Sequence, residues 1–485
     1  MGLSVAAERD YDIIALDAPN AYQQGHRIGR PGAYIELPST IAAEYNAPDG
    51  TPMCIYAEGP IQGEIPAGDE WDAEVHEVVT DIGWTASEGV PAMYSYLDED
   101  GVISLFCKNV DEFLLMAPHG KPIVAATITS LEARWGSNPV LGKMKINYDA
   151  QEWRGYTFIR DRPRRALTIY MNRYIEQAVA HHLPEMLASP SGRPSAALPK
   201  GVTAKDVVSA LRLPPAEERK GQLDAEQKHY QTILGELAFP QPVLVRFGLA
   251  INMCMTVMCY PPRGPILPDH PGVTALLAVK LVLESAYDAR YDGITAGGDG
   301  DESSPRLRAD LHAELDMSSP PPLSPEVYGD ATWSAAPHDR YALAITFNRL
   351  LIRYQVKVAR TVADCSMSAE MHPTTEGGMQ AEYLHEICRA MGMPLVDPVV
   401  VATDSLSNAL VSRRQGTTVK VRHQLRRWQA LTARIVRGIV KVVHLPDVQM
   451  PVDFLTKWVT KKKVEASVEY LTNALNRVRH PSEAK

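Results

Sequence analysis

The run from Pro398 to Ala402, which reads Pro-Val-Val-Val-Ala, constrains the fold of this chain more than any other segment. A short run of β-branched residues without polar alternation is typical of a strand that is buried on both faces of a sheet. Asp404 stands just beyond this run. The segment therefore predicts a covered sheet with a carboxylate at the end of one of its strands.

The residues around this run alternate between strand and helix patterns. Other strands are expected at 326–330, Tyr341–Phe347, Val356–Val362 and Ile439–Val443. One helical stripe ends before Gly392 and consists of Leu384, Ile387, Cys388 and Met391. A second ends at Gly438 and consists of Val421, Leu425, Trp428, Leu431 and Ile435, so Trp428 is expected in the core. We predict an α/β domain with a mixed sheet.

Two segments have the composition of linkers. Residues 189–200 are rich in Ser and Pro, and residues 296–325 combine Gly, acidic residues and Pro. The 485 residues are enough for roughly three domains at ~150 residues each. We therefore expect folded regions at 1–165, 166–295 and 326–463, a linker at 296–325 and a C-terminal basic tail at 464–485.

The net charge of −9 conceals a strong asymmetry. From Val401 to Lys485 there are 16 Lys and Arg against 6 Asp and Glu, whereas the residues before Val401 have 33 against 52. Such a chain suggests that its basic end faces a polyanion, although a solvated helical face explains the charge equally well. The candidate nucleic-acid-binding residues are Arg413, Arg414, Lys420, Arg422, Arg426 and Arg427.

Membrane and secreted classes are disfavoured by the sequence. No run of ~18 uncharged apolar residues occurs, and the N-terminus lacks a cationic and apolar signal pattern. The six cysteines include no Cys-x-x-Cys pair, which fits reduced thiols. We expect an intracellular protein, cytoplasmic or nuclear, without a membrane partner, and the oligomeric state stays open.

Four carboxylates stand beside the predicted elements of the C-terminal region. Asp330 ends a strand, Glu370 lies ahead of the helix that carries Leu384, Asp404 follows the buried strand, and Asp453 precedes Phe-Leu-Thr-Lys-Trp. Phosphodiester hydrolysis needs charge neutralisation and an activated water, which two Mg²⁺ ions ~4 Å apart supply. Because Mg²⁺ prefers carboxylate oxygens, three or four convergent Asp and Glu residues are the expected protein contribution. Taken singly, each of them is more often a helix cap or a surface charge.

The segments around these carboxylates resemble the RNase H domain of Copia-type retroelements. Residues 329–333 (Gly-Asp-Ala-Thr-Trp) resemble its opening, and 366–371 (Ser-Met-Ser-Ala-Glu-Met) resemble its Ser-Ser-Thr-Glu-Ala-Glu-Tyr signature. Residues 399–409 resemble the strand that leads into Asp-Asn-Gln-Ser-Ala, and 422–428 match a Lys-His…Arg-Tyr pattern. Residues 444–457 resemble Val-Pro…Ala-Asp-Ile-Leu-Thr-Lys. Five matches in the family's order make the resemblance specific.

This resemblance implies a nuclease that cleaves RNA in RNA–DNA hybrids with two Mg²⁺ ions, Mn²⁺ being the alternative. It implies metal binding by Asp330, Glu370, Asp404 and Asp453. His444 corresponds to a mobile histidine that assists proton or product handling in related nucleases. An ordinary surface histidine at a strand end explains His444 equally well.

The upstream sequence resembles the reverse transcriptase of the same family. Residues 16–22 (Leu-Asp-Ala-Pro-Asn-Ala-Tyr) resemble its first palm motif, and 109–112 (Asn-Val-Asp-Glu) resemble its Tyr-Val-Asp-Asp hairpin. The resemblance implies that Asp17 and Asp111 hold polymerase metals and that Tyr22 excludes a 2′-hydroxyl group. Glu112 replaces the second hairpin Asp, and only 16 residues precede Asp17. We therefore expect a palm that lacks its fingers and has no polymerase activity of its own.

Together these patterns predict a multidomain α/β and α+β chain. A reverse-transcriptase palm remnant at 1–165 and a thumb and connection region at 166–295 are followed by the RNase H-like mixed-sheet domain at 326–463. The expected function is that of an RNase H-type endonuclease. Two alternatives stay open: a catalytically inactive nucleic-acid-binding or scaffold remnant of a retrotransposon, and a chain that does not fold stably.

Overall fold

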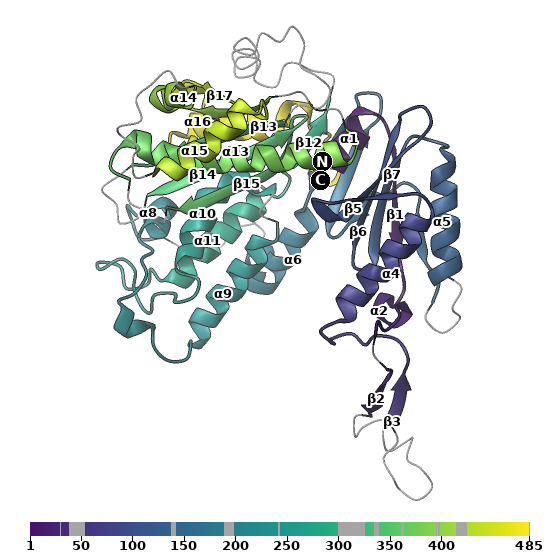
Figure 1. Ribbon diagram of the computed structural model, residues 1–485. Coiled ribbons are helices and arrows are strands. Elements are labelled where there is room, and N and C mark those ends of the chain that lie inside the picture. Colours follow the sequence, from purple (N-terminus) through teal and green to yellow (C-terminus); the bar gives the residue numbers. More distant parts are fainter. Residues whose placement is uncertain are drawn as a thin grey trace, which may run out of the picture.

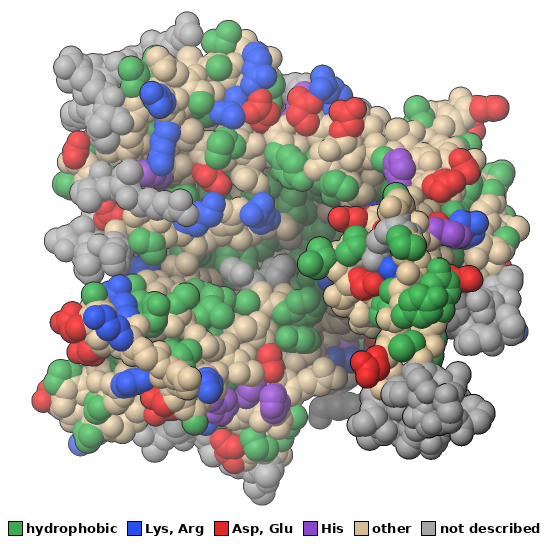
Figure 2. Space-filling view, turned by 60° about the horizontal axis from the view of Figure 1, so that its bottom comes forward, with side chains coloured by type: hydrophobic (Ala, Val, Ile, Leu, Met, Phe, Trp, Pro, Cys, Tyr) green, Lys and Arg blue, Asp and Glu red, His purple; other side chains and the backbone are tan. Residues whose placement is uncertain are grey.

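The computed structural model describes the chain except residues 30, 38–53, 137–141, 189–197, 241–242, 299–324, 334–338, 360–362, 394, 396–397, 414–423 and 485. Within these described residues, the sheets have six, four, five and two strands. Figure 1 shows the six-stranded sheet with its helices on one side of the molecule and the five-stranded sheet with a helical region on the other. The surface is hollowed between these two parts (Figure 2). The predicted multidomain α/β and α+β fold class is confirmed.

The six-stranded sheet forms the N-terminal, palm-like part, and all of its strand pairs are antiparallel. Its order is β4 (Thr85–Ser87), β5 (Val90–Leu97), β6 (Ile103–Asn109), β7 (Glu112–Ala117), β1 (Asp12–Asp17) and β8 (Lys145–Asn147). Successive side chains of a strand point to opposite faces. Ile14 accordingly packs with Trp71 and Trp135, which come from α4 (Ala67–Asp81) and α5 (Pro122–Trp135). Ile13 joins the core on the other face, which includes Val5 of α1 (Gly2–Glu8).

A two-stranded hairpin of β2 (Ala33–Glu36) and β3 (Cys54–Ala57) follows the short helix α2 (Ala21–Gln24). In Figure 1 it extends away from the body of the molecule. Its exposed side chains include Tyr34, Ile55 and Tyr56.

A four-stranded sheet and a group of helices make up the connection region. The sheet order is β12 (Ile294–Gly297), β11 (Ala166–Tyr170), β10 (Tyr156–Asp161) and β9 (Glu152–Trp153). The helices are α6 (Asn172–His182), α7 (Pro184–Ala188), α8 (Ala204–Ser209), α9 (Ala225–Ala238), α10 (Gly248–Thr256) and α11 (Ala275–Asp288). Because β10 and β11 pair across the predicted boundary at 165/166, the palm and connection regions share this sheet.

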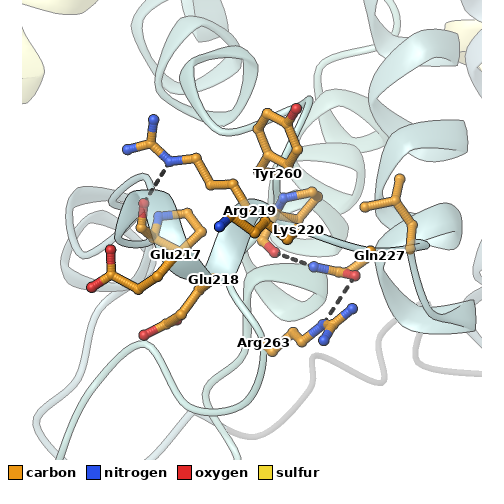
Figure 3. Close-up of a pocket in the computed structure, with 11 residues that line it drawn as sticks. Glu217, Glu218, Arg219, Lys220, Gln227, Tyr260 and Arg263 are labelled. Atoms are coloured by element: carbon orange, nitrogen blue, oxygen red, sulfur yellow. Dashed lines mark hydrogen bonds between the residues drawn. The ribbon is translucent and has the colours of Figure 1, made fainter.

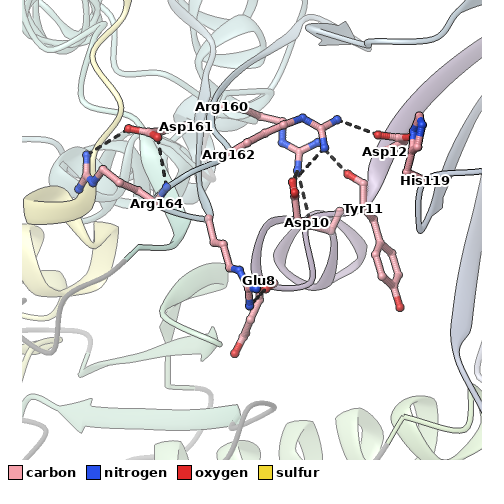
Figure 4. A network of polar contacts seen from close by, with 11 residues as sticks. Glu8, Asp10, Tyr11, Asp12, His119, Arg160, Asp161, Arg162 and Arg164 are labelled. Atoms are coloured by element: carbon pink, nitrogen blue, oxygen red, sulfur yellow. Dashed lines mark hydrogen bonds and ion pairs between the residues drawn. The ribbon is translucent and has the colours of Figure 1, made fainter.

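A polar network fastens the connection sheet to the palm (Figure 4). Nη1 of Arg160 donates to the Tyr11 carbonyl oxygen at 2.7 Å. Arg162 donates from Nη1 to Asp10 at 2.9 Å and from Nη2 to Asp12 at 2.8 Å. Both arginines lie in or next to β10, so charge-assisted hydrogen bonds hold β10 against the start of β1.

The C-terminal part is built on a five-stranded mixed sheet. Its order is β15 (Leu350–Val358), β14 (Arg340–Phe347), β13 (Pro325–Ala331), β16 (Val399–Thr403) and β17 (Val440–His444). The first three strands pair antiparallel, whereas β13, β16 and β17 pair parallel. Val327 and Val401 pack beneath α13 (Ser366–Ala390) and α15 (Leu425–Val436). The other face joins the core that contains the connection helices.

Two predicted boundaries of secondary structure are wrong. The strand expected to begin at Val356 begins at Leu350 instead. Polar Arg353 interrupts the apolar pattern of this segment, and the strand accommodates it because β15 is an edge strand and Arg353 faces water. Glu370, expected ahead of a helix, lies inside α13. Pro373 and the glycine pair at 377–378 are poor helix formers, yet they sit in the helix where neighbours approach closely. A Cβ atom on Gly377 would lie 3.0 Å from Val327 and 3.1 Å from Val401.

The expected basic tail at 464–485 is instead packed against the fold. Residues 461–472 form α16 (Lys461–Thr472), and its Tyr470 ring meets that of Tyr328 edge-on at 5.8 Å. Beyond the helix, Nδ2 of Asn473 donates to the Gly297 carbonyl oxygen at 2.9 Å. Apolar side chains at helical spacing, including Val468 and Leu471, bury one face of α16, which the count of basic residues did not reveal.

No helix among the described residues combines the length and the apolar character that a transmembrane segment needs.

Candidate metal centre

Two of the predicted carboxylates meet at one edge of the five-stranded sheet because their strands are parallel neighbours. Gly329 of β13 is aligned with Thr403 of β16. The residues that follow them, Asp330 and Asp404, therefore lie side by side at the carboxyl ends of these two strands. Asp330 is fully buried, and Asp404 is half-buried.

The third carboxylate comes from the helix that covers this edge. Glu370 is buried, and its Oε1 accepts a hydrogen bond of 2.9 Å from the backbone N–H of Ala331. Asp330, Glu370 and Asp404 each offer one oxygen atom, and these three atoms all lie within 4.8 Å of one another. The structure thus brings together three of the four carboxylates that the sequence singled out.

Burial and mutual repulsion disfavour the charged forms of these groups. Burial, followed by the charge of Asp404, raises the pKa of Asp330 to about 7. Burial, followed by the charges of Asp330 and Asp404, raises the pKa of Glu370 well above its usual range. Burial also raises the pKa of Asp404, while the cation of Lys457 opposes the shift.

The donor set fits a hard divalent cation. Carboxylate oxygens are the ligands that Mg²⁺ and Mn²⁺ favour. Oδ2 of Asp330 accepts a hydrogen bond from the Thr456 hydroxyl group, whereas its buried Oδ1 has no hydrogen-bond partner among the described residues. An unpaired carboxylate oxygen beside two other carboxylates is the arrangement that a bound cation would satisfy.

Asp453, the fourth predicted ligand, does not join this set. It lies in the short helical turn Asp453–Leu455 and is almost fully buried. Its Oδ1 and Oδ2 are ion-paired with Lys457 and Lys463. Among the described residues, the oxygen atoms that converge within 4.8 Å belong to the other three carboxylates.

Lys457 is a site residue whose role sequence reasoning missed. Burial opposes its charged form, but the charge of Asp330 and the hydrogen bond to Asp453 outweigh burial and raise its pKa. Its position in the Asp-Phe-Leu-Thr-Lys motif was a signal, since Lys457 stands one helical turn beyond Asp453.

His444 ends β17, beside the end of β16. Its Nε2 lies 3.1 Å from the backbone carbonyl oxygen of Asp404. Because a carbonyl oxygen only accepts, Nε2 carries the hydrogen. The structure therefore places the predicted histidine at the edge of the carboxylate set, in contact with the backbone of one member.

The predicted basic residues have different settings. Arg426 and Arg427 are exposed on α15. Arg413 donates from Nε to the Val442 carbonyl oxygen at 3.0 Å, which ties it to the sheet. Arg414, Lys420 and Arg422 lie outside the described residues. Trp428 is half-buried against a small cluster that includes Met371, in line with the predicted apolar stripe.

The acidic residues of the palm-like part, Asp17, Asp111 and Glu112, lie together where β1 ends and β7 begins. In the pairing of β1 with β7, Asp17 stands opposite Glu112, and Asp111 precedes Glu112 in the hairpin turn. Burial, followed by the charges of Asp111 and Asp17, raises the pKa of Glu112. Asp17 is ion-paired with Lys145 at 2.9 Å. Among the described residues, these acids do not form a set of three within 4.8 Å.

Tyr22 belongs to α2, and its partly buried ring packs against the core beneath the palm sheet.

A polar pocket of about 250 Å³ lies in the connection region (Figure 3), and its lining includes none of the acids of the two sites described above. Its lining mixes acidic Glu217 and Glu218 with basic Arg219 and Arg263. Gln227 bridges the pocket wall, since its Nε2 donates to the Pro261 carbonyl oxygen at 2.6 Å. No residue that the sequence singled out lines this pocket.

Comparisons with known proteins agree with the motifs. No protein-family model matches the chain. The retrovirus-related Pol polyprotein from transposon TNT 1-94 of Nicotiana tabacum is 22% identical over 469 residues. The match covers 96% of this chain and 31% of that polyprotein, so the chain spans about a third of the length of this relative.

Solved structures give weaker likenesses. The prototype foamy virus protease–reverse transcriptase covers 97% of this chain, which covers 68% of that chain, with 10% identity and a TM-score of 0.20. The N-terminal RNase H domain of a Mycobacterium tuberculosis protein is matched over 97% of its length and 30% of this chain, with 12% identity and a TM-score of 0.23. Over nearly its whole length, this chain is thus similar to a Copia-type retrovirus-related Pol polyprotein, as its motifs predicted.

Proposed function

We propose that the C-terminal domain is an RNase H-type endonuclease that hydrolyses the RNA strand of RNA–DNA hybrids with two divalent metal ions, preferably Mg²⁺. The observation that carries this proposal is the convergence of Asp330, Glu370 and Asp404 within 4.8 Å. Three buried or half-buried carboxylates repel one another, so the cluster is costly unless a cation compensates it.

Asp330, Glu370 and Asp404 would hold the ions. When bound, the ions would supply an activated water and charge stabilisation for the leaving oxygen. Asp404 is the least buried of the three, so it stands on the side from which water and a phosphate group approach. Mn²⁺ is the alternative ion, since it shares the preference for oxygen ligands.

Neighbouring residues would position the ligands. The Thr456 hydroxyl group holds one oxygen of Asp330. Nδ2 of Asn408 donates to the Glu370 carbonyl oxygen at 3.1 Å and to Oγ1 of Thr374 at 2.6 Å, which fixes the turn of α13 that carries Glu370. Side chains that hydrogen bonds already hold in place lose less conformational entropy when a ligand binds, so these contacts preorganise the site.

His444 would handle a proton during the reaction. Its Nε2–H is engaged by the Asp404 carbonyl oxygen, so Nδ1 is the ring nitrogen that would accept or deliver the proton. Arg426 and Arg427 would contact phosphates of the hybrid, because both are exposed on one helix of the same domain.

The test is cleavage of a labelled RNA–DNA hybrid by the purified chain in Mg²⁺ or EDTA, beside Asp404→Asn and Glu370→Gln. The matched control is Glu386→Gln, a partly exposed glutamate about 24 Å further along the helix that carries Glu370. We expect Mg²⁺-dependent cuts in the RNA strand that vanish in Asp404→Asn and Glu370→Gln and persist in Glu386→Gln. Cuts that persist in Asp404→Asn would contradict the proposal.

The ion pairs of Asp453 favour a second candidate function. With both oxygens held by Lys457 and Lys463, Asp453 already has protein cations in place of a metal. A catalytically inactive nucleic-acid-binding remnant would keep such pairs and the exposed arginines. It predicts hybrid binding that weakens with salt, without cleavage in Mg²⁺ or Mn²⁺.

For the palm-like region we propose a structural role without polymerase activity. Lys145 neutralises Asp17, and Glu112 adds a methylene group where metal geometry is strict. Primer extension on an RNA template with Mg²⁺ tests this, and incorporation that is lost in Asp17→Asn would overturn it.

A further inference from the structure

A second group of metal-ligating side chains lies in the connection region, far along the chain from the carboxylate set. It consists of His181 and His182 in the last turn of α6 and Glu236 in the last turn of α9. One ligand atom from each residue lies within 4.8 Å of the other two. The function proposed above uses none of these residues.

The distances from the Glu236 oxygen to the two histidine nitrogens match the separation between two ligands of a tetrahedral metal ion. Oε1 of Glu236 lies 3.3 Å from Nδ1 of His181 and 3.1 Å from Nε2 of His182. For metal–ligand bonds of ~2.0–2.1 Å, two ligands of a tetrahedral ion are about 3.3 Å apart. Oε1 of Glu236 therefore lies at the expected ligand-to-ligand distance from one nitrogen of each imidazole ring.

The burial of His182 is a second, independent observation. Its side chain is only 3% exposed, and its Nε2 makes no well-oriented hydrogen bond among the described residues, although Oε1 of Glu236 lies 3.1 Å away. A buried polar atom that lacks a hydrogen bond costs free energy unless another partner satisfies it. Nε2 faces Glu236, so an ion between the two would be that partner.

The other ring nitrogen of His182 already has a contact that fixes the orientation of the ring. Its Nδ1 lies 3.1 Å from Nε2 of His229, which stands one turn into α9. In metal sites, a ligating histidine commonly directs its second nitrogen to a hydrogen-bond partner that fixes the ring. His229 can play this part for His182.

Adjacent helical residues point about 100° apart, so two neighbouring histidines seldom reach one point. Here His181 uses its near nitrogen, Nδ1, and His182 uses its far nitrogen, Nε2. The helix also ends directly after His182, at Leu183 and Pro184. The difference in reach lets both rings approach the same carboxylate.

We propose that His181, His182 and Glu236 form a Zn²⁺ site that ties the end of α6 to the end of α9. Two imidazole nitrogens and one carboxylate oxygen suit Zn²⁺, whereas Mg²⁺ prefers oxygen ligands alone. His181 is 66% exposed and Glu236 is 28% exposed, so an ion can enter from solvent and keep a water as its fourth ligand.

The first experiment titrates the metal-stripped full chain with Co²⁺, used as a spectroscopic probe for Zn²⁺, in saturating Mg²⁺. We expect the intense visible absorption of tetrahedral Co²⁺, with one ion bound per chain and displaced by Zn²⁺. His181→Ala and Glu236→Gln should each weaken binding at least tenfold. His229→Ala should weaken it roughly 10–100-fold through loss of ring orientation.

Two controls keep the result interpretable. His119→Ala removes a histidine that is 91% exposed in the palm-like part and should leave binding unchanged. Asp404→Asn alters the carboxylate set and should also leave the tetrahedral spectrum unchanged. Because His181 is exposed, far-ultraviolet circular dichroism of metal-free His181→Ala should match that of the unaltered chain. A missing tetrahedral spectrum, or one that survives both His181→Ala and Glu236→Gln, would overturn the proposal.

Discussion

The ammonium group of Lys457 is ion-paired with the carboxylate of Asp453, one helical turn earlier in the chain. The same cation opposes the burial that raises the pKa of Asp330, Glu370 and Asp404. In the absence of metal, Lys457 is thus a counter-ion that the protein itself supplies to its buried carboxylates.

Replacing Lys457 by an uncharged residue should leave the repulsion between the carboxylates uncompensated. For Lys457→Met we expect the free energy of unfolding in EDTA to fall by roughly 1–2 kcal/mol, because Asp453 is buried while the ammonium group is partly screened by water. Stabilisation by Mg²⁺, measured as the rise in Tm, should become larger. Lys461→Met, which removes a lysine that is 89% exposed, is the control and should change neither quantity. Equal stability of Lys457→Met and the unaltered chain in EDTA would contradict the counter-ion role.

The carboxylate set should make metal-free stability depend on pH. The pKa of Asp330 is about 7 in the folded chain and about 4 when unfolded, so the folded state binds more protons between these values. Its contribution is fully present below about pH 4 and is lost as pH rises through about 7, on the order of 4 kcal/mol for three pKa units. The raised pKa values of Glu370 and Asp404 act in the same direction.

Urea unfolding in EDTA across this pH range measures the effect. Asp330→Asn should flatten the decline, and saturating Mg²⁺ should also flatten it because the ion favours the charged carboxylates. A decline of equal size in Asp330→Asn would show that other groups cause it.

His444 should affect the reaction rate more than metal binding. Its ring contacts the backbone of Asp404 and does not belong to the converging carboxylates. If hybrid cleavage is detected, His444→Ala should lower kcat about 10²-fold or more through loss of proton transfer. The Mg²⁺ concentration for half-maximal rate should change little. An unchanged kcat would show that His444 is an ordinary surface histidine at a strand end, without a role in the reaction.

Gly329 should be intolerant of a side chain because it faces the helix that carries Glu370. A Cβ atom there would lie 2.9 Å from Cβ of Pro373 and 3.3 Å from Cδ2 of Leu343, and the proline ring cannot move without the helix. We expect Gly329→Ala to lower the free energy of unfolding by roughly 1–3 kcal/mol and to reduce cleavage. Gly235→Ala in α9, where nothing lies within 4 Å of the added atom, should instead stabilise by about 0.5–1 kcal/mol.

The sequence predicted those features of the C-terminal domain that depend on neighbouring residues. The valine run became β16, with Asp404 at its end. Gly392 and Gly438 end their helices with φ values of +66° and +73°, a region that favours glycine. Each of these features follows from the conformational preferences of a few consecutive residues, so the local sequence was sufficient.

What the sequence alone could not decide is which distant groups meet. Parallel pairing of β13 with β16 aligned Asp330 with Asp404, and close packing kept Pro373 inside the helix that delivers Glu370. The pairing of Asp453 with Lys457 and Lys463, and of His182 with Glu236, likewise required the folded arrangement of elements. Local preferences set the identity of strands and helices, but contacts between distant side chains depend on how their apolar faces are buried together. Only the tertiary structure fixes that burial, because it involves the whole chain at once.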